Sequence, residues 1–495
     1  MLLLERDPLV LSELSREDER TATTGLLGPR RATLKLWVAL VALVHFDRGA
    51  ATVAAMDVTD WGNPAAHSAS FGRAVAFLAG HSIGVVLGSS LAGSFFQQAS
   101  AKALLLLGLA ANLIFSVALG FQDNPGLIVT TVLRFSSGVA AALPLVYLPL
   151  WVDEFSPRES HGHWMSIVQT GVPLGQLCGV VAAGAAAEAG QTWRHALLFQ
   201  AVLLFLVIMR VAIIPTSQVD AANPTLTARL DALSLHSPDG AQLGRLQNLA
   251  REFREMLQSV NRNPLTMSLS SVLCLLHATG AGLALWAAPY LALSDGAPSP
   301  LVSLSLAALA LSCCPVAGIY IGALACNRAD GFKAGMHAVA LRVACAFATL
   351  AALCAPLNSA SSSFVLRLFL LAGWLFSAGA LLPISVGLLM TSMPSYLRSF
   401  SSASTVLVLH VVSFSVIPGA AAVLMGFFIR PEKGLCFGVG LVLWATLPAA
   451  ILLLFAYARE PKGTGPAGSL SGVDDLTFSD ISYELARRRM STSPL

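Results

Sequence analysis

The chain has 495 residues, of which 55% are hydrophobic and only 12% are charged. Soluble domains carry about 25% charged residues, so this composition excludes a soluble protein of this size and indicates one that crosses a membrane many times. The net charge of +3 says little by itself, and nothing else in the sequence supports binding to nucleic acid.

Twelve apolar runs along the chain are long enough to cross a bilayer, for which a helix needs about 20 residues. We therefore predict an all-α integral membrane protein with twelve transmembrane helices. The runs are 35–58, 71–94, 103–121, 126–150, 163–187, 194–214, 265–291, 300–325, 335–355, 364–390, 402–427 and 436–457.

The first run carries ionisable residues in its middle, namely His45, Asp47 and Arg48. A charge at bilayer depth costs several kcal/mol unless it faces a protein-lined cavity, so these residues indicate a pathway for a solute, an ion or a proton. Asp47 and Arg48 point about 100° apart on a helix, so they cannot satisfy each other and each needs another partner. For His45, a neutral hydrogen-bonded role and a proton relay both remain open.

The connections between the runs alternate in charge. Basic residues such as Lys102, Arg158 and Arg328 lie in every second loop, whereas the loops at 59–70 and 292–299 contain no Lys or Arg. By the positive-inside rule, both termini are expected in the cytoplasm.

The longest interior break falls after the sixth run, where apolar residues recur every three or four positions from Leu243 to Leu257. This spacing predicts an amphipathic helix lying along the cytoplasmic face. Six runs, a polar linker and six more runs are typical of a transporter built from two halves. The predicted units are a cytoplasmic tail at 1–33, an N-terminal half at 34–214, a linker at 215–263, a C-terminal half at 264–458 and a cytoplasmic tail at 459–495.

The segment from Gly93 to Lys102 resembles the charged turn between the second and third helices of the major facilitator superfamily, Gly-x-Leu-Ala-Asp-Arg-x-Gly-Arg-Lys. Gly93 and Lys102 match it, whereas Gln97 replaces the acid. A partial repeat after the eighth run includes Arg328. The resemblance implies the major facilitator fold, with alternating access by two rocking halves. It also implies that Gly93, Lys102 and Arg328 belong to loops that lock one conformation, here less firmly.

Arg134 and Gly138 in the fourth run resemble the Arg-x-x-x-Gly pattern of the same superfamily, and Arg367 takes the corresponding place in the tenth run. In that fold the first, fourth, seventh and tenth helices line the cavity, which implies that Asp47 faces Arg134. The candidate substrate-binding and proton-coupling residues are therefore Asp47, Arg48, Arg134, His45 and His277. The alternative for Asp47 and Arg134 is an ion pair that only fixes helix packing.

The Asp47-Arg48 pair and the segment from Pro394 to Pro418, which includes His410, are similar to the spinster group of lipid transporters. That group has a glutamate seven residues after the arginine of the fourth helix, where this chain has Ala141. The resemblance implies that the substrate is an anionic amphiphile such as a lysolipid, with protons as the candidate coupling ion. A small organic anion, an amino acid, or a receptor that transports nothing are the alternatives.

Other patterns complete the expectations. Glu5 to Val10 approximates an acidic di-leucine sorting signal, so the candidate membranes are endolysosomal, vacuolar or plasma membrane.

No nucleophile–base pair or phosphate-binding loop is present, so we expect a transporter and not an enzyme. The eight cysteines lack metal-ligand spacing, and we expect neither a metal nor a cofactor. We expect a monomer in contact with membrane lipids, His410 in buried packing, and Trp286 and Tyr290 at a membrane interface.

Overall fold

The computed structural model describes residues 28–50, 79–93, 95–96, 99–121, 127–157, 160–220, 258, 262–329, 331, 336–393, 398–428 and 430–460. The amphipathic helix predicted at 243–257, the sorting signal, the tail after residue 460, and the positions Gln97 and Pro394 lie outside these residues.

Twelve helical units follow one another in the described residues, and the predicted fold class is confirmed. Ten of them are long and apolar enough to cross a membrane, and helices at 28–50 and 79–93, called here the first and second helix, complete the set. The others are α3 (Ala101–Gly120), α4 (Leu127–Phe155), α5 (His161–Gln169) with α6 (Gly171–Glu188), α7 (His195–Ile213), α10 (Pro264–Ala292), α11 (Pro300–Arg328), α12 (His337–Ala360), α13 (Phe364–Thr391), α14 (Arg398–Val408) with the π-helix η4 (Leu409–Val416) and α15 (Ile417–Gly426), and α16 (Pro431–Trp444) with α17 (Thr446–Arg459).

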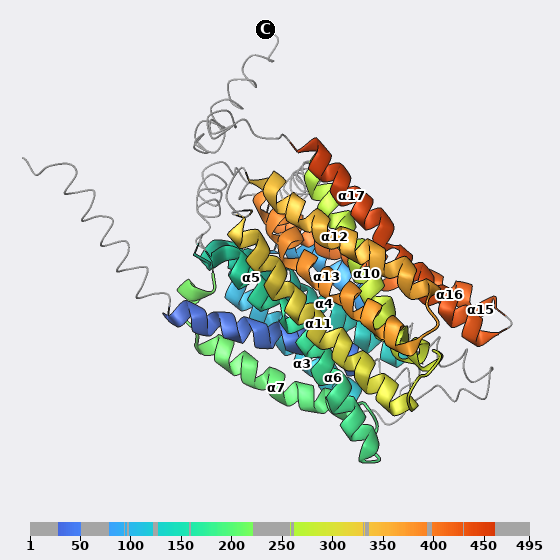
Figure 1. The fold of residues 1–495 in the computed structure, drawn as a ribbon. Coiled ribbons are helices and arrows are strands. Elements are labelled where there is room, and N and C mark those ends of the chain that lie inside the picture. The colour runs from blue at the N-terminus through green and yellow to red at the C-terminus, as the bar shows by residue number, and fades with distance from the viewer. Residues whose placement is uncertain are drawn as a thin grey trace, which may run out of the picture.

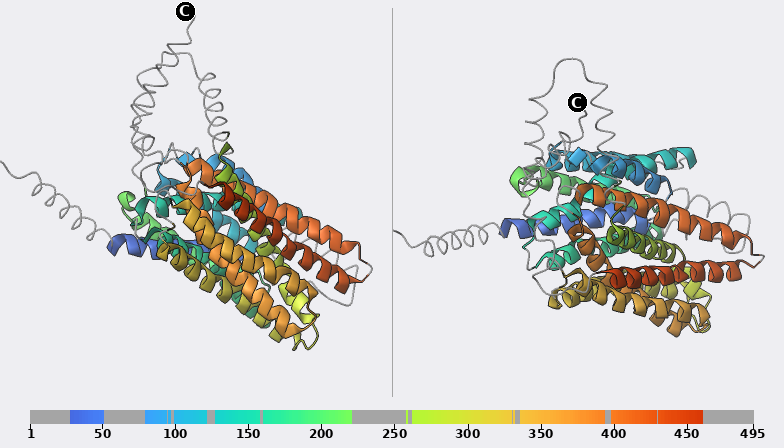
Figure 2. Two further views of the ribbon diagram at one scale, coloured as in Figure 1. Left: turned by 45° about the horizontal axis from the view of Figure 1, so that its top comes forward. Right: turned by 90° about the horizontal axis from the view of Figure 1, so that it is seen from above.

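The helices form two groups that correspond to the two halves of the sequence. In the first group α3 packs against α4 and α7, and in the second α17 packs against both α10 and α12. Figures 1 and 2 show the first group in blue to green and the second in yellow to red, with the helices of both running side by side. The groups meet where α5 and α6 contact α11, and where α4 contacts α14.

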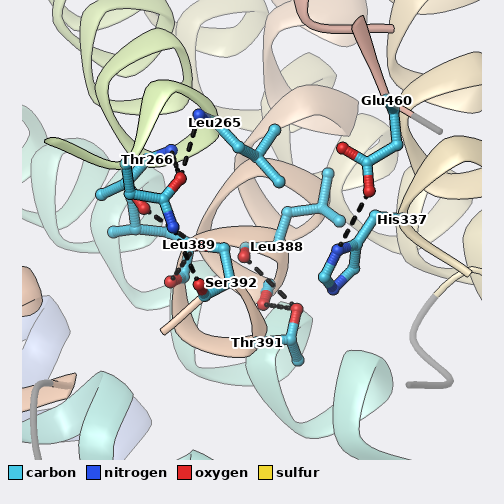
Figure 3. A network of polar contacts seen from close by, with 10 residues as sticks. Leu265, Thr266, His337, Leu388, Leu389, Thr391, Ser392 and Glu460 are labelled. Atoms are coloured by element: carbon cyan, nitrogen blue, oxygen red, sulfur yellow. Dashed lines mark hydrogen bonds and ion pairs between the residues drawn. The ribbon is translucent and has the colours of Figure 1, made fainter. Parts of the chain in front are cut away.

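One end of the bundle, called here the linker end, contains the end of α7 and the start of α10. Asn263 caps α10 there, because its Oδ1 accepts hydrogen bonds from the backbone N–H groups of Leu265 and Thr266 at 3.0 and 3.2 Å, as N-cap side chains do. Thr266 Oγ1 lies 3.0 Å from Ser392 Oγ at the end of α13. Figure 3 shows this network, together with the 3.4 Å contact between His337 Nδ1 and Glu460 Oε1.

Glycines allow the same close helix approach in both halves. A Cβ at Gly138 of α4 would overlap the carbonyl oxygen of His81 on the second helix, and a Cβ at Gly379 of α13 would overlap that of Pro315 on α11. The second and fourth units thus pack as the eighth and tenth do. This correspondence indicates an internal structural repeat, as transporters of two related halves have.

The chain that follows α7 is bound to the N-terminal half through residue Asp220. A short 3-10 turn, η2 (Thr216–Gln218), lies in it, and Val219 is fully buried. We call this arrangement the linker clamp. Its hydrogen bonds are donated by Lys102 Nζ to the carbonyls of Ala212 and Ile214 (2.8 and 2.6 Å), by Lys102 N to Asp220 Oδ1 (2.7 Å), by Trp151 Nε1 to the carbonyl of Gln218 (2.8 Å) and by Tyr147 to the carbonyl of Val219.

Candidate functional site

A cavity of about 210 Å³ lies between the two halves. The first helix, α4, α5 and α6 line it from one side, and α10, α11, α13, α14 and η4 line it from the other. Most of the wall is aliphatic or aromatic, and none of the described lining residues is acidic. The polar lining residues are His45, Arg48, Gln169, Gln176, His277, Ser402, Thr405 and His410.

Asp47 and Arg134 form an ion pair one layer behind this wall, between the first helix and α4. The residues are only 4% and 3% exposed, so each charge depends on the other to offset its loss of hydration. The geometry brings together the two residues that the sequence pattern paired. Among the described residues, the second carboxylate oxygen of Asp47, Oδ1, has no hydrogen-bond partner.

His81 on the second helix joins this buried layer, and sequence reasoning missed it. Its Nδ1 lies 4.0 Å from Asp47 Oδ2 and 3.3 Å from Ser137 Oγ. The glycine contact between the second helix and α4 holds His81 at this depth, because Gly138 packs directly against its backbone. The run around His81 is apolar, and only the helix pairing shows that this histidine faces the acid.

Arg48 lines the cavity and connects the two halves. Its Nη2 lies 2.9 Å from Nε2 of His410 on η4, and Nδ1 of His410 lies 2.8 Å from the carbonyl oxygen of Val406. Sequence reasoning assigned His410 to buried packing. The residue is indeed only 4% exposed, but it borders the cavity and contacts the one arginine among the described lining residues.

The π-helical turn around His410 has a cause in the sequence. Pro418 has no backbone N–H and cannot donate to the carbonyl one turn earlier. The helix widens to i→i+5 bonding directly before it, over Leu409–Val416. Such π segments occur frequently at functional sites. A histidine about two turns before a proline in an apolar run is the signal that could have identified this position.

His45 and His277 both border the cavity, as a substrate-binding role requires. Nδ1 of His277 lies 2.9 Å from the carbonyl oxygen of Leu273, which is the same i−4 arrangement that His410 has. The predicted loop residues do not reach the cavity. Gly93 lies in the last described turns of the second helix, Lys102 forms part of the linker clamp, and Arg328 is exposed as the last residue of α11, all at the linker end.

Arg367, the expected counterpart of Arg134, does not line the cavity. Its guanidinium donates to the carbonyl of Ser361 (2.7 Å) and to Ser294 Oγ (2.9 Å) and lies over the ring of Tyr290. Tyr290 is 2% exposed and donates to Asn358 Oδ1 at 3.0 Å. The tyrosine expected at a membrane interface therefore anchors the interior of the C-terminal half.

A second ion pair joins the halves beyond the cavity, toward the linker end. Arg398 at the start of α14 pairs with Asp153 near the end of α4. One turn closer to the cavity, Ser402 Oγ donates to the carbonyl of Val146 at 2.9 Å. We call the Asp153–Arg398 pair the latch. The two residues are 245 positions apart in the sequence.

The comparisons with known proteins agree with this architecture. The model of the Major Facilitator Superfamily matches residues 38–418. Among solved structures, the chain is similar to the proton:xylose symporter XylE bound to 6-bromo-6-deoxy-D-glucose, with 14% identity, a TM-score of 0.59, and 87% of this chain and 96% of that chain covered. It is also similar to the E. coli fucose:proton symporter FucP, with 13% identity, a TM-score of 0.54, and 86% and 99% covered.

These structural likenesses concern the fold, because the identities are low. A search of curated proteins finds no match. The family match covers well over half of the chain, and it agrees with twelve helical units in two halves around a central cavity. The chain belongs to the Major Facilitator Superfamily and is a multi-pass membrane transporter.

Proposed function

We propose that this transporter moves an anionic amphiphile, such as a lysolipid, by alternating access, and that protons drive it. The observation that carries the proposal is the cavity between the halves, with an arginine and no acid among its described lining residues. Arg48 is placed to pair with an anionic head group, and the aliphatic wall is suited to an acyl chain. A guanidinium in such surroundings forms strong charge-assisted hydrogen bonds with a carboxylate, sulfonate or phosphate.

The apolar wall also indicates which class of substrate the cavity can bind. Leu145, Leu148, Leu273, Leu276 and Leu311 are among the residues that face the cavity. A site for a sugar needs a donor or acceptor for each hydroxyl, because buried polar groups without partners are costly. XylE and FucP are named for sugars, but their likeness to this chain supports the fold alone.

Proton coupling is proposed for the layer behind the wall. Asp47 holds Arg134 with one carboxylate oxygen, and its Oδ1 can accept a proton. Protonating Asp47 removes the charge that compensates Arg134, so the ion pair loosens and the contact of the first helix with α4 changes. Ionisable residues inside a membrane commonly belong to proton relays in pumps and transporters.

Flux in proteoliposomes tests the proposal. The purified protein is offered a labelled lysophospholipid or a pool of small organic anions and amino acids, with and without a pH gradient. We expect gradient-dependent lysolipid flux that Arg48→Gln abolishes. The matched control is Arg210→Gln, which removes an exposed arginine of α7 and should leave the flux unchanged.

The remaining outcomes identify the alternatives. Flux of a small anion without lysolipid flux would reassign the substrate. No flux in either pool from a well-folded protein would favour a receptor derived from a transporter. Flux that is unaffected by the pH gradient and by Asp47→Asn would show that the Asp47–Arg134 pair only fixes helix packing. We further propose that both termini are cytoplasmic and that the protein works as a monomer in an endolysosomal, vacuolar or plasma membrane.

A further inference from the structure

The contact between Arg48 and His410 determines which nitrogen of the histidine carries its proton. Arg48 Nη2 can only donate, since a guanidinium has no acceptor. Nε2 of His410, 2.9 Å away, must therefore be the acceptor. The proton of the neutral ring then lies on Nδ1, which donates to the carbonyl of Val406 at 2.8 Å.

This tautomer makes the contact incompatible with protonation. A proton from solvent would bind at Nε2, the atom that accepts from Arg48, and turn it into a donor. Two donors and two positive charges would then face each other, so the Arg48–His410 hydrogen bond would break. The two side chains would then be two cations that face each other, one on each half. They would lie beside an apolar cavity with no acid among its described lining residues.

We propose that Arg48 and His410 form a single anion site that is occupied only when His410 carries a proton, so that anion and proton bind together. The inference rests on the proposed function and deepens it, because it assigns the anion-binding pair and its charge balance. In the empty site Arg48 contributes one positive charge and His410 none. In the occupied site His410 contributes a second, which the anion cancels, and the net charge is unchanged.

Other titratable groups surround His410, and the test must separate them from it. These groups are His45 and Arg48 of the first helix, His277 of α10, His81 of the second helix and the pair of Asp47 and Arg134. Cys274 of α10 lies beside Ser413 of the same π-helix, because Ser413 Oγ donates to its carbonyl at 2.7 Å. His195 at the start of α7 is the control, because its Nδ1 also lies near a backbone carbonyl oxygen, that of Thr192 at 3.1 Å, but the residue is exposed and does not border the cavity.

The test measures binding of a fluorescent long-chain alkyl sulfonate to the full-length protein in nanodiscs over a range of pH. A sulfonate stays ionised throughout, so its own titration cannot contribute. If one proton binds with each anion, affinity falls about tenfold per pH unit above the titration of His410. Weakly buffered samples should take up one proton for each probe bound. In His410→Gln, whose amide oxygen can still accept from Arg48, both effects should disappear, whereas His195→Gln should retain them.

The outcomes distinguish this inference from the proposed function. Proton uptake that persists in His410→Gln while the probe binds would overturn the paired site and leave the substrate class intact. Absence of probe binding to the wild-type protein would overturn both. An independent readout is the ¹⁵N NMR signal of His410 without any anion. A neutral ring protonated on Nε2 at high pH would contradict the assignment, and a ring protonated on Nδ1 would support it.

Discussion

Removing the latch should shift the conformational equilibrium of the two halves. Asp153 and Arg398 form the ion pair that connects α4 to α14 at the linker end. Their side chains are 10% and 30% exposed, so the pair lies between a surface and a buried one. Exposed pairs contribute about 0.2–1 kcal/mol, and breaking a fully buried pair costs about 3–5 kcal/mol. We therefore expect Asp153→Asn to disfavour the state closed at the linker end by about 1–2 kcal/mol, or roughly 5–30-fold in population.

Distance measurements between spin labels on the two halves can detect this change. Ala99 and Met336 are exposed positions at the linker end, one in each half, and the exposed native cysteines would first be replaced. Asp153→Asn should increase the population with a long distance, and exchanging the two charges should restore the short one. Glu154→Gln is the control, since Glu154 is adjacent but exposed. Identical distance distributions in Asp153→Asn and the parent protein would show that the latch does not hold the halves together.

Three further predictions concern stability and the linker clamp. Asp47→Asn should lower the free energy of unfolding by about 3–5 kcal/mol, because it leaves the Arg134 cation without its carboxylate. Adding Arg134→Met should restore much of this stability, as measured by thermal unfolding. Equal stability of the single variant and the parent protein would contradict this prediction. Gly179→Ala should cost about 1–3 kcal/mol because its Cβ overlaps the backbone of the first helix, whereas Gly184→Ala on the same helix meets nothing within 4 Å and should be neutral. Asp220→Ala should speed hydrogen exchange of the amides at the start of α3, where its carboxylate accepts a hydrogen bond, and unchanged exchange there would remove the carboxylate from the clamp.

The parts of the site that could be predicted are those whose signal is local. A charge in the middle of an apolar run requires a compensating partner, and Asp47 and Arg134 are charges at comparable depth in two runs. Their pairing follows from that need together with the resemblance to a known fold. The twelve spans follow from length and composition alone. In the described residues, ten of them coincide with apolar helices long enough to cross a membrane, with bounds that agree within about five residues.

The parts that could not be predicted depend on which face of each helix turns inward. His81 and His410 lie in apolar runs, where a histidine that packs and a histidine that faces a cavity look the same. The position of His410 also depends on the π-helical turn before Pro418, which rotates the helix face relative to regular α-helical spacing. Asp153 and Arg398 lie 245 residues apart, and neither has a local feature that indicates the other.

The linker clamp connects the start of the linker directly to a helix that carries part of the candidate site. The chain is fastened at Gln218, Val219 and Asp220, two of them to side chains of α4. The same helix carries Arg134 of the buried ion pair and Asp153 of the latch. Tension applied to the linker would therefore reach α3 through Asp220 and α4 through Gln218 and Val219, and α4 carries both the ion pair and the contact between the halves. We therefore expect a protein or modification that pulls on the linker to act on the contact between the halves without touching the cavity.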